Sequence, residues 1–234
     1  MQVVILAGGF GTRLSEETDL IPKPMVRIGG IPILQHIMNF YSKFGHKDFI
    51  IALGYKAEVI REYFETVKNP GWRINLVDTG LETSTGGRIK KLENLLDNEF
   101  MLTYGDGLSN IDIELLLAHH QRLGRLATVT AVRPPARFGT IEISKGMVTK
   151  FAEKDPQDAG WINGGFFCLN RKVCSYIENY ATSFESEPLR QLVSMGQLTA
   201  YEHHGWWQPM DTLRDKRSLE SLWDKGKAPW LMPE

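Results

Sequence analysis

The feature that most constrains the fold is an apolar pentapeptide followed at once by a glycine cluster. Residues 3–7 read Val-Val-Ile-Leu-Ala, and Gly8-Gly9-Phe10-Gly11-Thr12-Arg13 come next. A continuous apolar run of this length indicates a strand buried on both faces, as in parallel sheets. Glycines at the carboxyl end of such a strand let backbone N–H groups approach phosphate oxygens. The loop is therefore expected either to hold a phosphorylated ligand or to make a tight turn.

Strand-like and helix-like segments alternate along the first 132 residues, which predicts an α/β fold with a mostly parallel central sheet flanked by helices. From residue 138 onwards, short strand-like segments with fewer long helices between them predict a smaller, mixed β/α C-terminal part. No linker or repeat interrupts the sequence, so one domain covering 1–234 is expected. Further strands are expected at 49–53, 72–77, 100–104, 127–132, 140–143, 147–151 and 165–169, and the clearest helices begin at 33, 113 and 212.

Composition excludes several classes of protein. The net charge is −1 and charged residues make up 24%, so no global field attracts nucleic acid or an anionic membrane. No apolar stretch approaches the length of a membrane span, and no signal peptide is recognisable at Met1. Cys168 and Cys174 lack the spacing of a metal site and are expected to be reduced, buried thiols. We therefore expect a cytoplasmic protein with no nucleic-acid or membrane partner.

Two cations near the glycine loop favour a triphosphate ligand. Arg13 offers a fork to phosphate oxygens, and Lys23 is a compact charge in backbone stiffened by Pro22 and Pro24. The alternative is a solvated basic loop. No Lys-Ser or Lys-Thr follows the loop as in a Walker A motif, and Leu14 replaces the third glycine of a dinucleotide fingerprint.

Asp106 lies between two glycines just after an expected buried strand. A carboxylate there can hold Mg²⁺ against phosphates, although an Asp in a tight turn is the simpler interpretation. Asp211 is the candidate for a second ligand, and it can equally be the N-cap of the last helix. Spacing alone does not bring these two residues together.

Four other polar groups allow two interpretations each. Gly86-Gly87-Arg88 is either a second loop for backbone approach or a turn before a helix. Glu153-Lys154 either binds a sugar phosphate or forms a solvated pair. The remaining two are histidine pairs: His119-His120 is expected on the surface of a helix, and His203-His204 is expected in a turn at a strand end rather than in a metal site.

The glycine loop together with Pro22-Lys23-Pro24 resembles the signature of sugar-1-phosphate nucleotidyltransferases. Further along, the chain resembles the cytidylyltransferases that act on glucose 1-phosphate. The segments that carry this closer resemblance are 15–18, 85–88, 104–107, 161–167 and 208–216.

The resemblance implies a Rossmann-like nucleotidyltransferase fold, Mg²⁺ as cofactor and a homo-oligomer. It also implies transfer of a cytidylyl group from CTP to α-D-glucose 1-phosphate, which gives CDP-glucose and pyrophosphate, for nucleotide-sugar and surface-polysaccharide biosynthesis. Lys23, Arg13 and Asp106 would be catalytic, and Asp106 and Asp211 would bind the metal. The nucleotide would contact Leu6, Ala7, Gly8, Gly9, Phe10, Gly11, Thr12, Arg13, Lys23, Thr83, Gly87, Arg88 and Gly105, and the acceptor would contact Glu153, Lys154, Asn163 and Gly164.

Three alternatives stay open. The same chemistry can use another nucleotide or another phosphorylated acceptor, because few contacts decide the choice of base. A non-catalytic nucleotide sensor is disfavoured because Arg13, Lys23, Asp106 and Asp211 are all present. A dinucleotide oxidoreductase is disfavoured by the missing third glycine.

Overall fold

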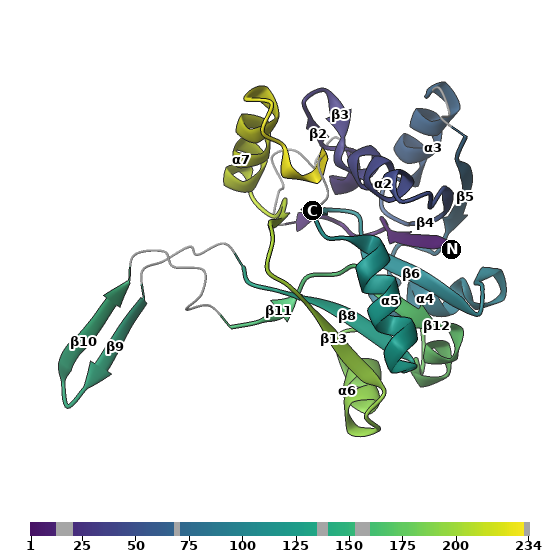
Figure 1. The fold of residues 1–234 in the computed structure, drawn as a ribbon. Coiled ribbons are helices and arrows are strands. Elements are labelled where there is room, and N and C mark those ends of the chain that lie inside the picture. The colour runs from purple at the N-terminus through teal and green to yellow at the C-terminus, as the bar shows by residue number, and fades with distance from the viewer. Residues whose placement is uncertain (13–20, 68–70, 135–139, 153–159, 232–234) are drawn as a thin grey trace.

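The computed structural model describes residues 1–12, 21–67, 71–134, 140–152 and 160–231. Its centre is an eight-stranded sheet, in which seven strands follow the pairing order β11-β8-β12-β6-β1-β4-β5 and β13 also pairs with β8 (Figure 1). The strands are β1 (Val3–Leu6), β4 (Asp48–Leu53), β5 (Arg73–Asp78), β6 (Glu99–Tyr104), β8 (Ala127–Val132), β11 (Ile162–Asn163), β12 (Phe167–Asn170) and β13 (Leu198–His203).

The sheet is mostly parallel, as predicted. Strand β1 pairs in parallel with β4 and β6, β4 pairs in parallel with β5, and β13 pairs in parallel with β8. Only β11 and β12 run antiparallel to their neighbours among the strands of this sheet that the structure describes. The parallel pairs place the carboxyl ends of β1, β4, β5 and β6 at one edge, where open α/β sheets bind ligands.

Successive side chains of a strand point to opposite sides, so each face of the sheet carries its own set of side chains. Each set packs into a separate core cluster. Val3 and Ile5 of β1 belong to one core cluster, whereas Val4 and Leu6 belong to the other. The first cluster is completed by residues of α2 (Ile33–Lys43), α3 (Ala57–Thr66), α5 (Ile113–Leu123) and α7 (Leu213–Asp224). The second is completed by residues of α4 (Thr85–Lys91), η5 (Arg171–Tyr176) and α6 (Glu187–Ser194).

The C-terminal part does not form a separate layer. Strand β13 extends the central sheet along all six of its residues, from Leu198 beside Ala127 to His203 beside Val132. Outside the central sheet, β2 (Arg27–Ile28) pairs antiparallel with β3 (Ile31–Pro32). Two further two-stranded ribbons occur in the described residues. One is the hairpin of β9 (Thr140–Ser144) and β10 (Met147–Ala152), which stands apart from the sheet in Figure 1. The other pairs β7 (Gly107–Ser109) with β14 (Trp207–Pro209).

One histidine of each pair is buried and lies within hydrogen-bonding distance of a hydroxyl group. His120 is not a surface residue, because its side chain is buried and its Nδ1 lies 2.8 Å from Thr128 Oγ1. His203 ends β13, as expected, and its buried Nε2 lies 3.2 Å from Ser109 Oγ.

Cys168 and Cys174 are free and buried, and burial raises the pKa of each thiol to about 12.

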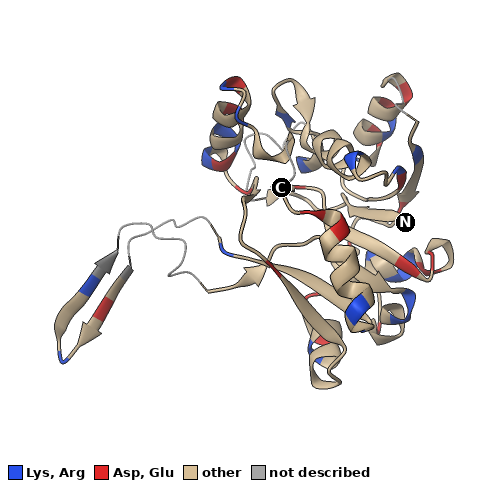
Figure 2. Cartoon of the chain, viewed as in Figure 1, with Lys and Arg blue, Asp and Glu red and all other residues tan. Residues whose placement is uncertain are grey.

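Residues of both charge signs occur along α3 and α7 (Figure 2). Within the described ranges, no helix is both long enough and apolar enough to span a bilayer.

Candidate active site

A cleft of about 820 Å³ opens at the carboxyl ends of β1 and β6. The glycine loop forms one wall, because residues 7–12 follow β1 directly. The segment 81–85 and the C-terminal segments around 163 and 207–211 form the other walls. The cleft therefore lies where the topology of an open α/β sheet places a ligand.

Lys23 reaches the floor of this cleft from a short 3-10 helix, η2 (Lys23–Met25), which starts directly after Pro22. Its side chain is 8% exposed, and its Nζ donates to Asp106 Oδ2 at 2.6 Å and to Asp211 Oδ1 at 2.7 Å. Burial opposes the charged form, but the two carboxylates outweigh it and raise the pKa of Lys23 above its usual value. The lysine is therefore a fixed cation in the cleft, and the solvated-loop interpretation is wrong for Lys23.

The two carboxylates meet because β7 and β14 pair antiparallel. Asp106 precedes β7 and Asp211 follows β14, with Pro209 opposite Gly107. The backbone N–H of Met210 donates to the carbonyl of Asp106 at 2.8 Å. A ribbon of three residues on each strand thus joins positions that are far apart in the sequence.

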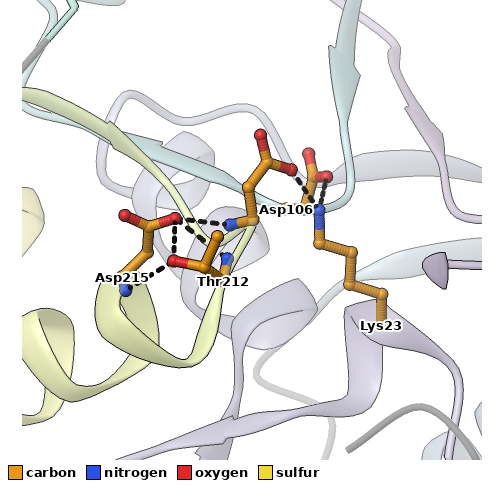
Figure 3. Close-up of polar contacts among 5 residues, drawn as sticks. Lys23, Asp106, Thr212 and Asp215 are labelled. Carbon is orange, nitrogen blue, oxygen red and sulfur yellow. Dashed lines mark hydrogen bonds and ion pairs between the residues drawn. The ribbon is translucent and has the colours of Figure 1, made fainter. Parts of the chain in front are cut away.

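Asp211 is not the N-cap of α7. Thr212 is the N-cap, and it forms a capping box with Asp215. Asp215 Oδ2 accepts from the backbone N–H of Asp211 at 3.1 Å and from that of Thr212 at 2.9 Å. Figure 3 shows this box beside the carboxylates that contact Lys23. The helix start therefore also fixes the backbone of Asp211.

Arg88 holds the glycine loop against the opposite wall. Its side chain is buried, and Nη2 donates to the carbonyl of Gly8 at 2.8 Å. Nη1 donates to the carbonyls of Leu53 and Gly80, both at 2.9 Å, and to Thr79 Oγ1 at 2.6 Å. Burial lowers the pKa of Arg88, although Asp78 opposes this. The guanidinium thus bonds to the protein's own backbone around the cleft.

Gly86 and Gly87 lie inside α4 rather than in a loop or a turn before it. A Cβ on Gly87 would lie 2.0 Å from the carbonyl oxygen of Tyr180, and one on Gly86 would lie 2.7 Å from that of Thr182. These glycines therefore allow α4 to pack closely on the segment before α6. Gly87 is absent from the described residues that line the cleft.

The donor set fits Mg²⁺. The bond from one ammonium to both Asp106 and Asp211 shows that a single cation can touch the two carboxylates at once. Magnesium usually takes one or two carboxylates and completes its shell with water and substrate phosphates. No group of three or more His, Cys, Asp and Glu suited to a metal occurs in the described ranges, which such a two-carboxylate site does not need.

Most of the residues named from the sequence meet in this one cleft. Arg13, Glu153 and Lys154 lie outside the described residues. The others that line the cleft are Leu6, Ala7, Gly8, Gly9, Phe10, Gly11, Thr12, Lys23, Thr83, Arg88, Gly105, Asp106, Asn163, Gly164 and Asp211.

Sequence reasoning missed several polar residues of the cleft, chiefly Tyr104, Ser183 and Glu185. Tyr104 directly precedes Gly105-Asp106, so its position was a usable signal. Burial, followed by the nearby Glu185 carboxylate, raises the pKa of Tyr104 well above its ordinary value. Ser183 and Glu185 lie in an irregular segment before α6 that carries no recognisable motif.

Curated relatives resemble the chain over almost its whole length. A glucose-1-phosphate cytidylyltransferase of Salmonella typhi is 50% identical, with 98% of each chain covered. A probable glucose-1-phosphate cytidylyltransferase of Bacillus subtilis is 42% identical, covering 98% of this chain and 99% of the relative. Among solved structures, HddC from Yersinia pseudotuberculosis superposes with a TM-score of 0.76 at 26% identity, covering 95% of this chain and 99% of that one.

These relatives confirm the resemblance drawn from the motifs, and the structural match confirms the fold. The sequence profile of the nucleotidyl transferase family matches residues 2–223. Glycine loop, buried lysine and paired carboxylates all fall within that range, and the chain belongs to the nucleotidyl transferase family.

Proposed function

We propose that this protein transfers the cytidylyl group of CTP to α-D-glucose 1-phosphate, producing CDP-glucose and pyrophosphate. The observation that carries the chemistry is the convergence of Asp106 and Asp211 on the Lys23 ammonium inside the glycine-loop cleft. The choice of CTP and glucose 1-phosphate is supported by the two cytidylyltransferase relatives, which match nearly the whole chain.

The cleft offers different chemistry at its two ends. We assign the nucleotide to the part of the cleft lined by residues 6–12 and Thr83, because glycine-rich backbone suits phosphates. We assign the acceptor to the part lined by Asn163 and Gly164. In this arrangement the reacting phosphates lie between the two ends, beside Lys23.

Asp106 and Asp211 would hold Mg²⁺. When bound, the ion would neutralise charge on the reacting phosphates. Both carboxylate side chains remain partly exposed, at 30% and 18%, so substrate oxygens and water can complete the shell.

Positioning and charge neutralisation account for the reaction. A phosphate oxygen of the sugar phosphate attacks the α-phosphorus of CTP, and a new P–O bond forms there. The bond between the α-phosphorus and the oxygen bridging to the β-phosphate breaks, and pyrophosphate leaves with the electron pair. The attacking oxygen is already ionised near neutral pH, so this step needs no protein base. Lys23 supplies a buried positive charge beside the transferred group.

The test is pyrophosphate release with Mg²⁺ and glucose 1-phosphate, comparing CTP, UTP, dTTP, ATP and GTP. We expect rapid release with CTP alone. Lys23→Met and Asp106→Asn should lower kcat by about 10²- to 10³-fold while the chain stays folded. Release with a different nucleotide would overturn the base assignment, and full turnover in either variant would overturn the assigned site.

The single-domain organisation, the homo-oligomer and the cytoplasmic location are also proposals. One sheet is shared by both core clusters, which supports a single domain. Ile141, Ile143, Met147 and Val148 of the β9–β10 hairpin are each more than half exposed, and a second copy could cover this apolar surface. Free thiols at Cys168 and Cys174 agree with a reducing compartment. Sedimentation at several protein concentrations tests the oligomer: a constant monomer mass would exclude it.

A further inference from the structure

The acceptor end of the cleft contains a hydrogen-bonded cluster of which the reaction described above uses only Asn163. Tyr104 Oη donates to Glu185 Oε1 at 2.6 Å, and Asn163 Nδ2 donates to Tyr104 Oη at 3.1 Å. Glu185 Oε2 accepts from Thr85 Oγ1 at 2.5 Å and from Ser183 Oγ at 2.7 Å. All five residues line the cleft.

Four separate segments build this cluster. Tyr104 ends β6, Asn163 ends β11 and Thr85 begins α4, while Ser183 and Glu185 lie just before α6. The two glycines of α4 allow this convergence, because they let the helix approach residues 180–182 closely. Phe184, which directly precedes Glu185, belongs to the second core cluster, so packing there fixes the position of Glu185.

The hydrogen bonds run in one direction, from Asn163 through Tyr104 to Glu185. The amide of Asn163 is oriented by its Oδ1, which accepts from the backbone N–H of Gly165 at 2.9 Å. Its Nδ2 therefore faces Tyr104 as a donor. The phenol accepts that bond and gives its own proton to Glu185. The chain of hydrogen bonds therefore has the Glu185 carboxylate, an acceptor, at one terminus and the Asn163 amide, a donor, at the other.

Both ends keep hydrogen-bonding capacity for a ligand. A carboxylate has about four acceptor positions, and bonds within the described chain fill one on Oε1 and two on Oε2 of Glu185. An amide nitrogen has two protons, and Asn163 uses one of them on Tyr104. The Glu185 side chain is exposed to the cleft, so the remaining acceptor position is accessible.

The charge of this end selects the kind of group that fits. Phosphates are drawn to the glycine loop and Lys23, whereas the Glu185 carboxylate repels them. A neutral ring bearing several hydroxyl groups can donate to Glu185 and accept from Asn163. We propose that Glu185 is a specificity-determining residue, whose carboxylate accepts a hydrogen bond from one hydroxyl of the acceptor's sugar ring. This inference rests on the proposed function, because it assigns a residue to the acceptor of that reaction.

The test measures kcat/KM for glucose 1-phosphate and for its singly deoxygenated analogues, which lack the 2-, 3-, 4- or 6-hydroxyl. The wild-type chain is compared with Glu185→Ala and Glu185→Gln. A site that bonds a hydroxyl rejects the analogue lacking it, by about 10- to 100-fold for one charged hydrogen bond. We expect the wild type to reject one analogue in this way and Glu185→Ala to lose that discrimination. Glu185→Gln, which keeps an acceptor oxygen, should lie between them.

Glu187→Gln is the matched control. Glu187 is an exposed carboxylate two residues away, and it bonds Gln191 within α6 at 3.2 Å without lining the cleft. It should keep the wild-type preference among the analogues. Because Glu185 also anchors Thr85 and Ser183, thermal unfolding of each variant is recorded, and Glu185→Gln replaces Glu185→Ala if the latter does not fold.

Three results would overturn the proposal. Equal losses for glucose 1-phosphate and every analogue in the Glu185 variants would mean that the residue only supports the fold. A change in the preference for CTP over UTP, with unchanged preference among the sugars, would assign Glu185 to the amino group of the base. A wild type that accepts all analogues equally would leave no hydroxyl for Glu185 to recognise. Failure of the proposed function is separate, because the wild type would then release no pyrophosphate from CTP and glucose 1-phosphate.

Discussion

The carboxylate of Asp215 accepts a hydrogen bond from the backbone N–H of Asp211 at 3.1 Å. Asp215 is the third residue of α7 and forms the capping box with Thr212, and Asp211 contacts Lys23 in the cleft. One side chain therefore both stabilises a helix end and orients a carboxylate of the active site. Stability and metal binding should respond together when it is changed.

Asp215→Ala should lower the free energy of unfolding by about 0.5–2 kcal/mol, the usual cost of losing a helix cap. It should also raise the Mg²⁺ concentration needed for half-maximal turnover, because the backbone of Asp211 loses its anchor. Urea unfolding and a Mg²⁺ titration measure the two effects. Asp224→Ala, at the exposed far end of the same helix, is the control. A destabilised variant with unchanged Mg²⁺ dependence would show that Asp211 is held without Asp215.

Two neighbouring glycines of the loop should differ in what they do. A Cβ on Gly8 would lie 2.2 Å from Arg88 Nη1 and 2.9 Å from the carbonyl carbon of Leu53, whereas a Cβ on Gly9 meets nothing within 4 Å. Gly8→Ala should therefore cost about 1–3 kcal/mol of stability through overpacking. Gly9→Ala should keep wild-type stability but raise the KM for CTP, since its methyl group would obstruct a phosphate. An unchanged KM in Gly9→Ala would argue that phosphates do not contact this loop.

Arg88→Lys should be strongly destabilising. Lysine cannot reproduce a fork that bonds the carbonyls of Gly8, Leu53 and Gly80 together, and each buried acceptor left unpaired costs about 1–3 kcal/mol. Thermal unfolding measures the loss. The KM for CTP should rise as well, because the two walls of the nucleotide end lose their common anchor. Arg73→Lys, on an exposed arginine paired with Asp48, should change neither quantity. Wild-type stability in Arg88→Lys would refute this account.

Acid should destabilise the fold through His36 and His120. Both side chains are buried, and burial lowers the pKa of each below the ordinary value of 6.5. Below that value the unfolded chain binds protons that the folded chain does not, so the free energy of unfolding falls as the pH drops. The slope should be at most about 1.4 kcal/mol per pH unit for each histidine. Urea unfolding at pH 7.5 and 5.5 measures it, and His120→Asn should reduce the difference.

The buried strands were predictable because their surroundings are uniform. A strand covered on both faces needs an unbroken apolar run, and β1, β4 and β6 each carry one. Strand β13 was not predicted, since Leu198–His203 is only partly buried and includes Thr199 and Glu202. Its conformation comes from pairing with β8 rather than from its own pattern.

The site was predictable where the chemistry is local. The glycine loop and Lys23 are close in sequence, and their residue types already indicated phosphate binding. The convergence of Asp106 and Asp211 on Lys23 was not derivable from spacing, because it depends on the pairing of β7 with β14. Glu185 gave no local signal at all. It joins Tyr104 only through the packing of α4 against the segment before α6.

The β7–β14 ribbon also sets the order in which a newly made chain can become competent. The glycine loop, Lys23 and Asp106 emerge early during synthesis, but Asp211 emerges about a hundred residues later. A nascent chain that has not yet released β14 lacks the second carboxylate. Catalytic competence is therefore delayed until β14 has left the ribosome and paired with β7, which brings Asp211 to Lys23.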